Sequence, residues 1–167
     1  YISVTGVQTC ALPILEAAGL SGLTIEDTEI PDPFDRKSGL PVSIEESIGK
    51  MKAALAARKD PDFVIIGRSG SVGSTGLEDA LQRIAAYQET GVDAIFLSGL
   101  TQREEIEACA QACRLPLLLG SIPKNLLDTD SLSKLGVRAV ITGHRPHSAG
   151  LHATYKTLRE TRAGTLG

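Results

Sequence analysis

The sequence predicts an α/β fold, namely the C-terminal portion (about strands 4 to 8) of a (β/α)8 TIM-type barrel that is truncated at both ends. Three observations predict it. Five short apolar runs each end in a polar or glycine-rich cluster, a helix-like stretch follows each run, and the units recur at roughly 30 residues. A complete barrel of this type needs about 250 residues, whereas the chain has 167.

The five apolar runs are the expected strands, and each leads into residues that can carry chemistry. Strands of such a barrel exit on one rim, where active sites are built, so acidic, basic, hydroxyl and imidazole groups should converge there. The second run is apolar throughout, as a strand buried on both faces should be. The runs and the residues that follow them are 23–25 with Glu26 and Asp27, 63–67 with Arg68, 94–97 with Ser98, 117–119 with Gly120 and Ser121, and 139–141 with Thr142, Gly143 and His144.

Helices are expected between and after these strands, bounded by polar or glycine residues of the kind that cap helix ends. Ser43 and Glu46 form a capping-box pattern that opens a helix over 44–58. The other expected helices are 77–90 followed by Gly91, 102–113 preceded by Thr101 as N-cap, a short helix capped by Asp130 and running to residue 135, and 148–162.

The first fourteen residues do not belong to this pattern. Residues 4–14 look like the translation of a common sequencing-library adapter, and we expect residues 1–14 to be non-native. The alternative is a native strand and turn. The partial barrel, as the catalytic domain, is expected over 15–167, beginning in the last turn of a helix that ends at Gly19.

The composition argues against nucleic acid and membranes as binding partners and favours a small-molecule substrate. The net charge is −3, and Lys and Arg are spread along helical segments, so no basic stripe for nucleic acid is expected. No apolar run approaches the roughly 20 residues that span a bilayer. A cytoplasmic protein with a small-molecule substrate is the prediction. Cys109 and Cys113 lie four apart on one helical face and are expected to be small buried or half-buried residues.

A set of ordered motifs resembles the isocitrate lyase and phosphoenolpyruvate mutase superfamily. The motifs are GLTIEDT at 22–28, FDRKSG at 34–39, KMKAALAAR at 50–58, IIGR at 65–68 and GVDAIF at 91–96. The C-terminal part, with LGVR at 135–138, GH at 143–144, ATY at 153–155 and LRE at 158–160, looks most like the oxaloacetate decarboxylase branch.

The resemblance implies a Mg²⁺-dependent carbon–carbon lyase acting on a 2-keto acid, with Mn²⁺ as the alternative metal. The implied reaction is decarboxylation of oxaloacetate to pyruvate through a metal-stabilised enolate, in a parent protein that is a homotetramer. Other members suggest alternatives: a phosphonopyruvate or phosphoenolpyruvate mutase type of enzyme, or another 2-keto-acid lyase. A non-catalytic fragment is the alternative from a different class, and the fragment alone is expected to be inactive because the family's Asp-rich metal motif lies upstream.

By resemblance, Glu26 holds magnesium through its water shell, and Asp27 is a second candidate metal contact. From the residues alone, the alternative for Glu26 is a salt bridge at the rim, and the alternative for Asp27 is a cap or loop hydrogen bond. Arg68 matches the substrate-binding arginine, and its guanidinium can hold a carboxylate bidentately; an ion pair with Glu26 is the alternative. His144 matches a histidine that hydrogen-bonds substrate or delivers a proton to the enolate.

The loop over 34–40 resembles the family's gating loop. Arg36 and Lys37 within it are predicted to contact an anionic substrate, with plain solvated charges as the alternative. The loop has no cysteine, which disfavours isocitrate and methylisocitrate lyase activities. Gly70 is a departure, because many relatives carry an Asp or Asn at this position.

Overall fold

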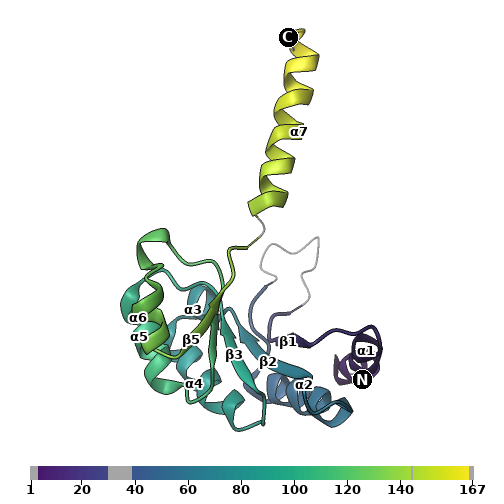
Figure 1. The fold of residues 1–167 in the computed structure, drawn as a ribbon, viewed down its shortest axis with the longest axis vertical. Helices are drawn as coiled ribbons and strands as arrows, with labels where there is room; N and C mark the ends of the chain where they lie inside the picture. The colour runs from purple at the N-terminus through teal and green to yellow at the C-terminus, as the bar shows by residue number, and fades with distance from the viewer. Residues whose placement is uncertain (1–3, 30–38, 144, 166–167) are drawn as a thin grey trace.

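The computed structural model describes residues 4–29, 39–143 and 145–165. Within them, five strands form one sheet in the order β1-β2-β3-β4-β5, and every neighbouring pair is parallel (Figure 1). Sequential parallel order is the arrangement of a β/α-barrel wall, so the predicted fold class is confirmed. The strands are β1 (Gly22–Glu26), β2 (Val64–Ser69), β3 (Ala94–Leu97), β4 (Leu117–Leu119) and β5 (Val137–Val140).

Helices cover one face of this sheet. α2 packs against β1 and β2, α4 against β2 and β3, and α6 against β5 (Figure 1). The helices are α1 (Val4–Ala17), α2 (Ile44–Ala57), α3 (Ser71–Ser74), α4 (Leu77–Gln88), α5 (Arg103–Ala112), the 3-10 helix η1 (Lys124–Leu126), α6 (Thr129–Lys134) and α7 (Arg145–Ala163).

The core lies between the sheet and these helices. All four residues of β3 are buried, and Ile65 of β2 and Leu117 of β4 are also inside. Met51 of α2 and Ile84 of α4 close the layer, each at most 1% exposed. Strands buried on both faces are continuous apolar runs, which is why the sequence pattern located them.

Sequence and structure agree on the bounds of β3 and β4 but differ elsewhere. β2 continues to Ser69, so Arg68 lies inside the strand, and β5 (Val137–Val140) ends one residue before the apolar run over 139–141 does. α3 and η1 were not predicted. Two cap assignments were wrong: Gln102, not Thr101, is the N-cap of α5, and Asp128, not Asp130, is that of α6. In both cases two neighbouring residues have polar side chains that can accept a hydrogen bond at the helix start, and the backbone conformation determines which of them is the N-cap.

The N-terminal helix crosses the predicted domain boundary without a break. α1 runs from Val4 to Ala17 and packs against α2, with Leu12 only 1% exposed. The predicted stop is confirmed, because Gly19 has φ +81°. The non-native origin of residues 1–14 stays a prediction.

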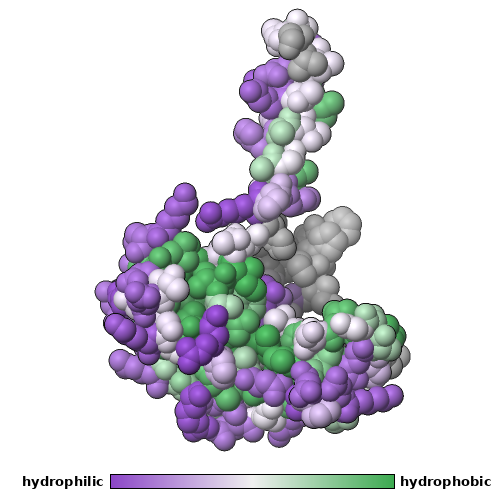
Figure 2. Space-filling model, in the orientation of Figure 1, coloured by the Kyte–Doolittle hydropathy of each residue, from purple (hydrophilic) through white to green (hydrophobic). Residues whose placement is uncertain are grey.

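Among the described residues, β1 and β5 each pair with a single strand, so both are edges. Hydrophobic residues gather on the surface over β5 (Figure 2), where Leu127 and Ile141 are 42% and 47% exposed. α7 leads away from the sheet and buries none of its described residues (Figure 1). In the described ranges, no helix combines the length and apolar character needed to cross a membrane.

The start of α5 yields a testable prediction about pH. Glu105 Oε2 accepts from the backbone N–H groups of Thr101 (2.8 Å) and Gln102 (2.9 Å), and these bonds hold the pKa of the carboxyl below its ordinary 4.5. The stability that ionised Glu105 adds to the folded protein is therefore complete above the ordinary pKa of 4.5, and it is lost as pH falls through the lower pKa of the folded state. We expect Glu105→Ala to lower the free energy of unfolding by about 0.5–1 kcal/mol at pH 7, and by less at pH 3, in urea titrations. Equal losses in Glu104→Ala, the exposed neighbour, would contradict this.

Candidate active site

The register of β1 with β2 places Glu26 opposite Arg68 at the carboxyl edge of the sheet. Arg68 Nη2 lies 3.2 Å from Glu26 Oε1. Thr28 Oγ1 donates to the same carboxylate oxygen at 3.3 Å. The two residues that the sequence placed on one rim are thus in direct contact, and the ion pair that it left open as an alternative is present.

Arg68 stacks on an aromatic ring, and one of its N–H donors has no hydrogen-bond partner among the described residues. Its guanidinium lies 5.0 Å from the centre of the Phe96 ring, the geometry of a cation–π contact. Its Nε–H is buried and has no hydrogen-bond partner among the described residues. A buried unsatisfied donor costs about 1–3 kcal/mol, so its presence favours a ligand acceptor. Nε and one Nη together form the fork that binds a carboxylate bidentately.

The Glu26–Arg68 pair is too exposed to be a major source of stability. The side chains are 42% and 33% exposed, respectively, and ion pairs of this kind contribute about 0–1 kcal/mol. An incoming anion can therefore compete for Arg68 without a large loss. The pair is compatible with both the structural and the substrate-binding interpretation.

Serine and glycine residues from the neighbouring strand ends border a hollow of about 560 Å³ beside Arg68. Ser98 follows β3 and Ser121 follows β4, so hydroxyl groups do converge on the rim as predicted. Gly143 has φ +73°, and a Cβ there would lie 2.4 Å from Ser121 Oγ. The positive φ favours glycine at this position, and the missing side chain leaves room for the Ser121 hydroxyl at the wall of the hollow.

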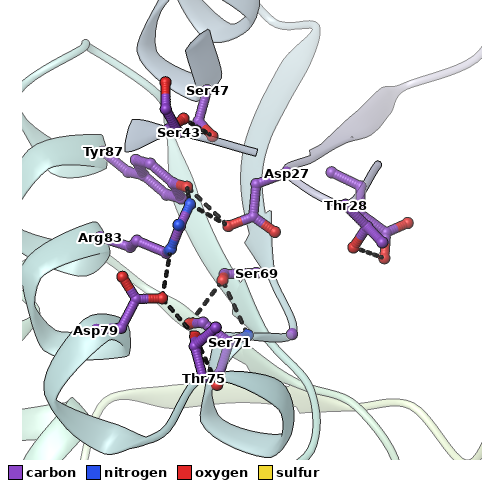
Figure 3. Close-up of polar contacts among 12 residues, drawn as sticks. Asp27, Thr28, Ser43, Ser47, Ser69, Ser71, Thr75, Asp79, Arg83 and Tyr87 are labelled. Carbon is purple, nitrogen blue, oxygen red and sulfur yellow. Dashed lines mark hydrogen bonds and ion pairs between the residues drawn. The ribbon is translucent and has the colours of Figure 1, made fainter. Parts of the chain in front are cut away.

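Asp27 does not join this group. Its side chain is fully buried, and Oδ2 accepts hydrogen bonds from Tyr87 Oη at 2.7 Å and Arg83 Nη1 at 3.3 Å (Figure 3). Successive side chains of an extended chain point to opposite sides, so Asp27 faces the helix layer while Glu26 faces the rim. The geometry disfavours the predicted metal contact, and we leave Asp27 out of the proposed metal site.

Lys50 supports the rim and was missed by sequence reasoning. It lies on the buried side of α2, is 6% exposed, and its Nζ donates to the backbone carbonyl of Glu26 at 2.5 Å. The available signal was its spacing, because Ser47, Met51 and Ala54 on the same helix are also buried. A cation on an apolar helix face indicates a specific acceptor.

Three predicted site residues, His144, Arg36 and Lys37, lie outside the described residues. The described ends of the loop around Arg36 and Lys37 are nevertheless joined, since Thr28 and Pro41 form an antiparallel bridge. Val42 N–H also donates to the Asp27 carbonyl at 2.7 Å. The base of this loop is therefore tied to the end of β1, directly beside Glu26.

Cys109 and Cys113 are not candidates for nucleophilic chemistry. Cys109 is buried and Cys113 half-buried, as predicted, and both are free thiols. Burial, with the nearby charge of Glu105, raises the pKa of the Cys109 thiol to about 11. It stays protonated near neutral pH, whereas the thiolate is the reactive form.

The rim offers Mg²⁺ one carboxylate among the described residues, that of Glu26. Mg²⁺ prefers oxygen ligands, keeps several waters and is commonly held through one or two carboxylates, and Glu26 supplies one partly exposed carboxylate. In the described part of the chain, no group of three or more His, Cys, Asp or Glu could hold a metal ion. Glu26 thus fits a water-mediated contact to a metal.

A sequential parallel sheet with an ion pair where its strands exit defines the class of β/α-barrel-type folds. The comparisons then give the family. The family model described as phosphoenolpyruvate phosphomutase matches residues 10–162, and the chain belongs to this family. The predicted superfamily is confirmed.

Curated relatives are similar over most of the chain. It is 48% identical over 150 residues to an oxaloacetate decarboxylase of Rhodopseudomonas palustris, covering 90% of this chain and 52% of that protein. It is 46% identical over 150 residues to an oxaloacetate decarboxylase of Bradyrhizobium diazoefficiens, with the same shares covered. The chain thus spans about half the length of the curated relatives that it matches.

Solved structures similar to this chain share its fold. A phosphonopyruvate hydrolase in complex with oxalate and Mg²⁺ superposes with a TM-score of 0.75 at 33% identity, over 96% of this chain and 57% of that chain. An oxaloacetate acetylhydrolase in complex with 3,3-difluorooxalacetate gives a TM-score of 0.76 over 98% of this chain and 58% of that chain. At 23% identity, this second likeness concerns the fold alone.

The contact made by Lys50 is open to a direct test. Lys50→Met keeps most of the apolar stem but leaves the Glu26 carbonyl without its donor, so we expect the free energy of unfolding to fall by about 1–2 kcal/mol. Lys52→Met, on the exposed side of the same helix, should change it by less than about 0.5 kcal/mol. Urea titration measures both, and indistinguishable midpoints would refute a supporting role for Lys50.

Proposed function

We propose that the protein containing this chain is a Mg²⁺-dependent lyase that decarboxylates oxaloacetate to pyruvate and carbon dioxide. The observation that carries the proposal is Arg68, whose Nε–H is buried without a partner at the carboxyl edge of the sheet beside Glu26. The likeness to oxaloacetate decarboxylases over 90% of the chain supports this choice of substrate. Because those relatives are about twice as long, the activity is proposed for the complete protein.

Arg68 binds a substrate carboxylate in this proposal. Stacking on Phe96 fixes the guanidinium plane, so little side-chain freedom remains to be lost on binding. The incoming carboxylate takes Nε and one Nη, and it displaces the weak contact with Glu26. Ser98 and Ser121 border the same hollow and supply hydroxyl groups for the remaining oxygens.

Glu26 is then free to hold Mg²⁺ through water molecules. When bound, the metal supplies positive charge next to the keto oxygen, where negative charge develops as the bond to the departing carboxylate breaks. Lys50 and Thr28 keep Glu26 in place, through its backbone carbonyl and its carboxylate respectively. Mn²⁺ fits the same oxygen donors.

His144 completes the reaction in this proposal. When the C3–C4 bond of oxaloacetate breaks, carbon dioxide leaves and the electron pair passes into the enolate of pyruvate. The enolate needs one proton at C3, and a histidine is the side chain best suited to deliver it near neutral pH. Arg36 and Lys37 are proposed to contact the anionic substrate. A cytoplasmic location and a homotetrameric parent stay predictions.

Hydrolysis or rearrangement of a phosphonopyruvate is the second candidate function. The 33% identity to a phosphonopyruvate hydrolase favours it over other reactions, but the higher identity to oxaloacetate decarboxylases places it second. Parallel assays for pyruvate from oxaloacetate, and for phosphate (hydrolysis) or phosphoenolpyruvate (rearrangement) from phosphonopyruvate, distinguish the two.

The first test is pyruvate release from oxaloacetate by the complete protein, with Mg²⁺ and with EDTA. We expect turnover well above the metal-only background, and a loss in kcat/KM of about 100-fold or more in Arg68→Ala, because two charge-assisted hydrogen bonds of about 1.5–3 kcal/mol each disappear. Arg103→Ala, which removes an exposed arginine of α5, is the control. Background rates in a folded wild-type protein would rule out the decarboxylase.

The role of His144 has its own test. His144→Gln keeps a hydrogen-bonding group but cannot deliver a proton, so we expect kcat to fall by about 10²–10⁴-fold and the pH dependence of kcat to flatten. His152→Gln, on exposed α7, should behave as wild type. An unchanged pH profile in His144→Gln would assign proton delivery to another group.

A further inference from the structure

A buried polar network lies behind the candidate site and connects the two strand ends that carry Glu26 and Arg68 (Figure 3). The next residue after each of them, Asp27 and Ser69 respectively, is 1% exposed. Both belong to the side of the sheet that the helices cover, since side chains alternate along a strand. Each site residue is thus followed directly by an anchor on the opposite side.

At the β1 end of the network, Asp27 is bound from α4. Arg83 Nη1 donates both to Asp27 Oδ2 at 3.3 Å and to Tyr87 Oη at 3.0 Å, and Tyr87 Oη donates to Asp27 Oδ2 at 2.7 Å. Burial, followed by the Asp27 charge, raises the pKa of Tyr87, so the phenol remains a donor. Asp27 Oδ1 has no hydrogen-bond partner among the described residues. The bonds to Arg83 and Tyr87 are therefore what holds this carboxylate.

At the β2 end, the same arginine is linked to α3 indirectly, through Asp79 of its own helix α4. Arg83 Nε donates to Asp79 Oδ2 at 2.8 Å, and Thr75 Oγ1 donates to that oxygen as well (Figure 3). Thr75 N–H donates to the Ser71 carbonyl at 2.8 Å. Ser69 Oγ in turn donates to Ser71 Oγ at 2.9 Å and accepts from Ser71 N–H at 3.2 Å.

Among the side chains that the structure describes, Arg83, which is 7% exposed, joins the two ends of the network. The strand backbones are also joined directly, since Asp27 N–H donates to the Arg68 carbonyl at 3.2 Å. Burial by itself raises the pKa of Asp79, but hydrogen bonds from Thr75 and Arg83 outweigh it and leave that pKa below its ordinary value. The carboxylate is thus ionised at neutral pH. Buried ion pairs of this kind often add little stability compared with apolar packing, so stability alone is a weak explanation for the network.

We propose that Arg83 is a positioning residue that sets the separation of Glu26 and Arg68. Its Nη1 binds Asp27, which follows Glu26. Its Nε binds Asp79, which connects to Ser69, the residue after Arg68. The part of this inference that concerns catalysis rests on the proposed function. The part that concerns geometry does not, because the Glu26–Arg68 distance can be measured without turnover.

The test compares Arg83→Met with Arg58→Met in the complete protein. Arg58 is a matched control, because it also joins a helix to the sheet, pairing with Asp93 at 2.8 Å, but at the start of the strands. Crystal structures of both variants report the Glu26–Arg68 separation, calorimetry reports the affinity for oxalate with Mg²⁺, and steady-state kinetics report kcat and KM. All are recorded below the melting temperature of the less stable variant.

We expect Arg83→Met to separate Glu26 from Arg68 beyond the 3.2 Å of the wild type and to lower kcat by about 10–100-fold, with weaker oxalate binding. Arg58→Met should leave these quantities unchanged even where it lowers the melting temperature. Arg83→Lys should recover part of kcat. Should Arg83→Met fail to fold, Tyr87→Phe, which removes one bond to Asp27 and keeps the ring, should lower kcat several-fold.

Two results would overturn the proposal. The first is a folded Arg83→Met variant in which both the Glu26–Arg68 distance and the kinetics are those of the wild type. If Arg83→Met does not fold, the same result in Tyr87→Phe would overturn the proposal. The other is an equal loss of kcat in Arg58→Met, which would make the effect a general consequence of destabilisation. If the wild type does not turn over oxaloacetate, a displaced Glu26–Arg68 pair in the variant still supports positioning, and only the proposed function fails.

Discussion

The candidate site depends on one constraint, the register in which Glu26 pairs with Arg68 across β1 and β2. A slip of β1 by one residue would turn Glu26 toward the helices and bring its buried neighbour Asp27 to the rim. Gly22 fixes the same register at the start of β1, where a Cβ would lie only 2.6 Å from the carbonyl oxygen of Val64. The contact of Arg68 with Phe96 follows from the next register, in which β2 pairs with β3 and places Arg68 opposite Phe96.

The two sides of the strand ends are built from different chemistry. On the rim, the Glu26–Arg68 pair is partly exposed and weak, which lets a ligand replace one of its contacts. Behind it, Arg83 is enclosed by two carboxylates and a phenol, where the loss of one partner leaves a buried charge uncompensated. The weak, partly exposed contacts thus face the rim, and the buried contacts face the helices.

The rim also shows what this chain contributes and what it leaves to the rest of the protein. It supplies a carboxylate, a guanidinium and two hydroxyl groups on adjacent strand ends, with small residues that keep the hollow open. The relatives that it resembles are about twice as long. Magnesium binding that needs more than one carboxylate would draw on residues beyond those described here.

The sequence by itself determined the five strands, their order and the residues at the strand ends, because strand burial leaves short-range patterns; α3 and η1 were not predicted. β3 and β4 were located to the residue, and Glu26 and Arg68 were assigned to one rim before their contact was visible. Only the tertiary structure decided that Asp27 turns away from the rim. It also decided the contacts of Lys50 and Arg83, whose partners lie 24 and 56 residues away. Local patterns carry no information about such partners, because these contacts exist only once helices and strands have packed.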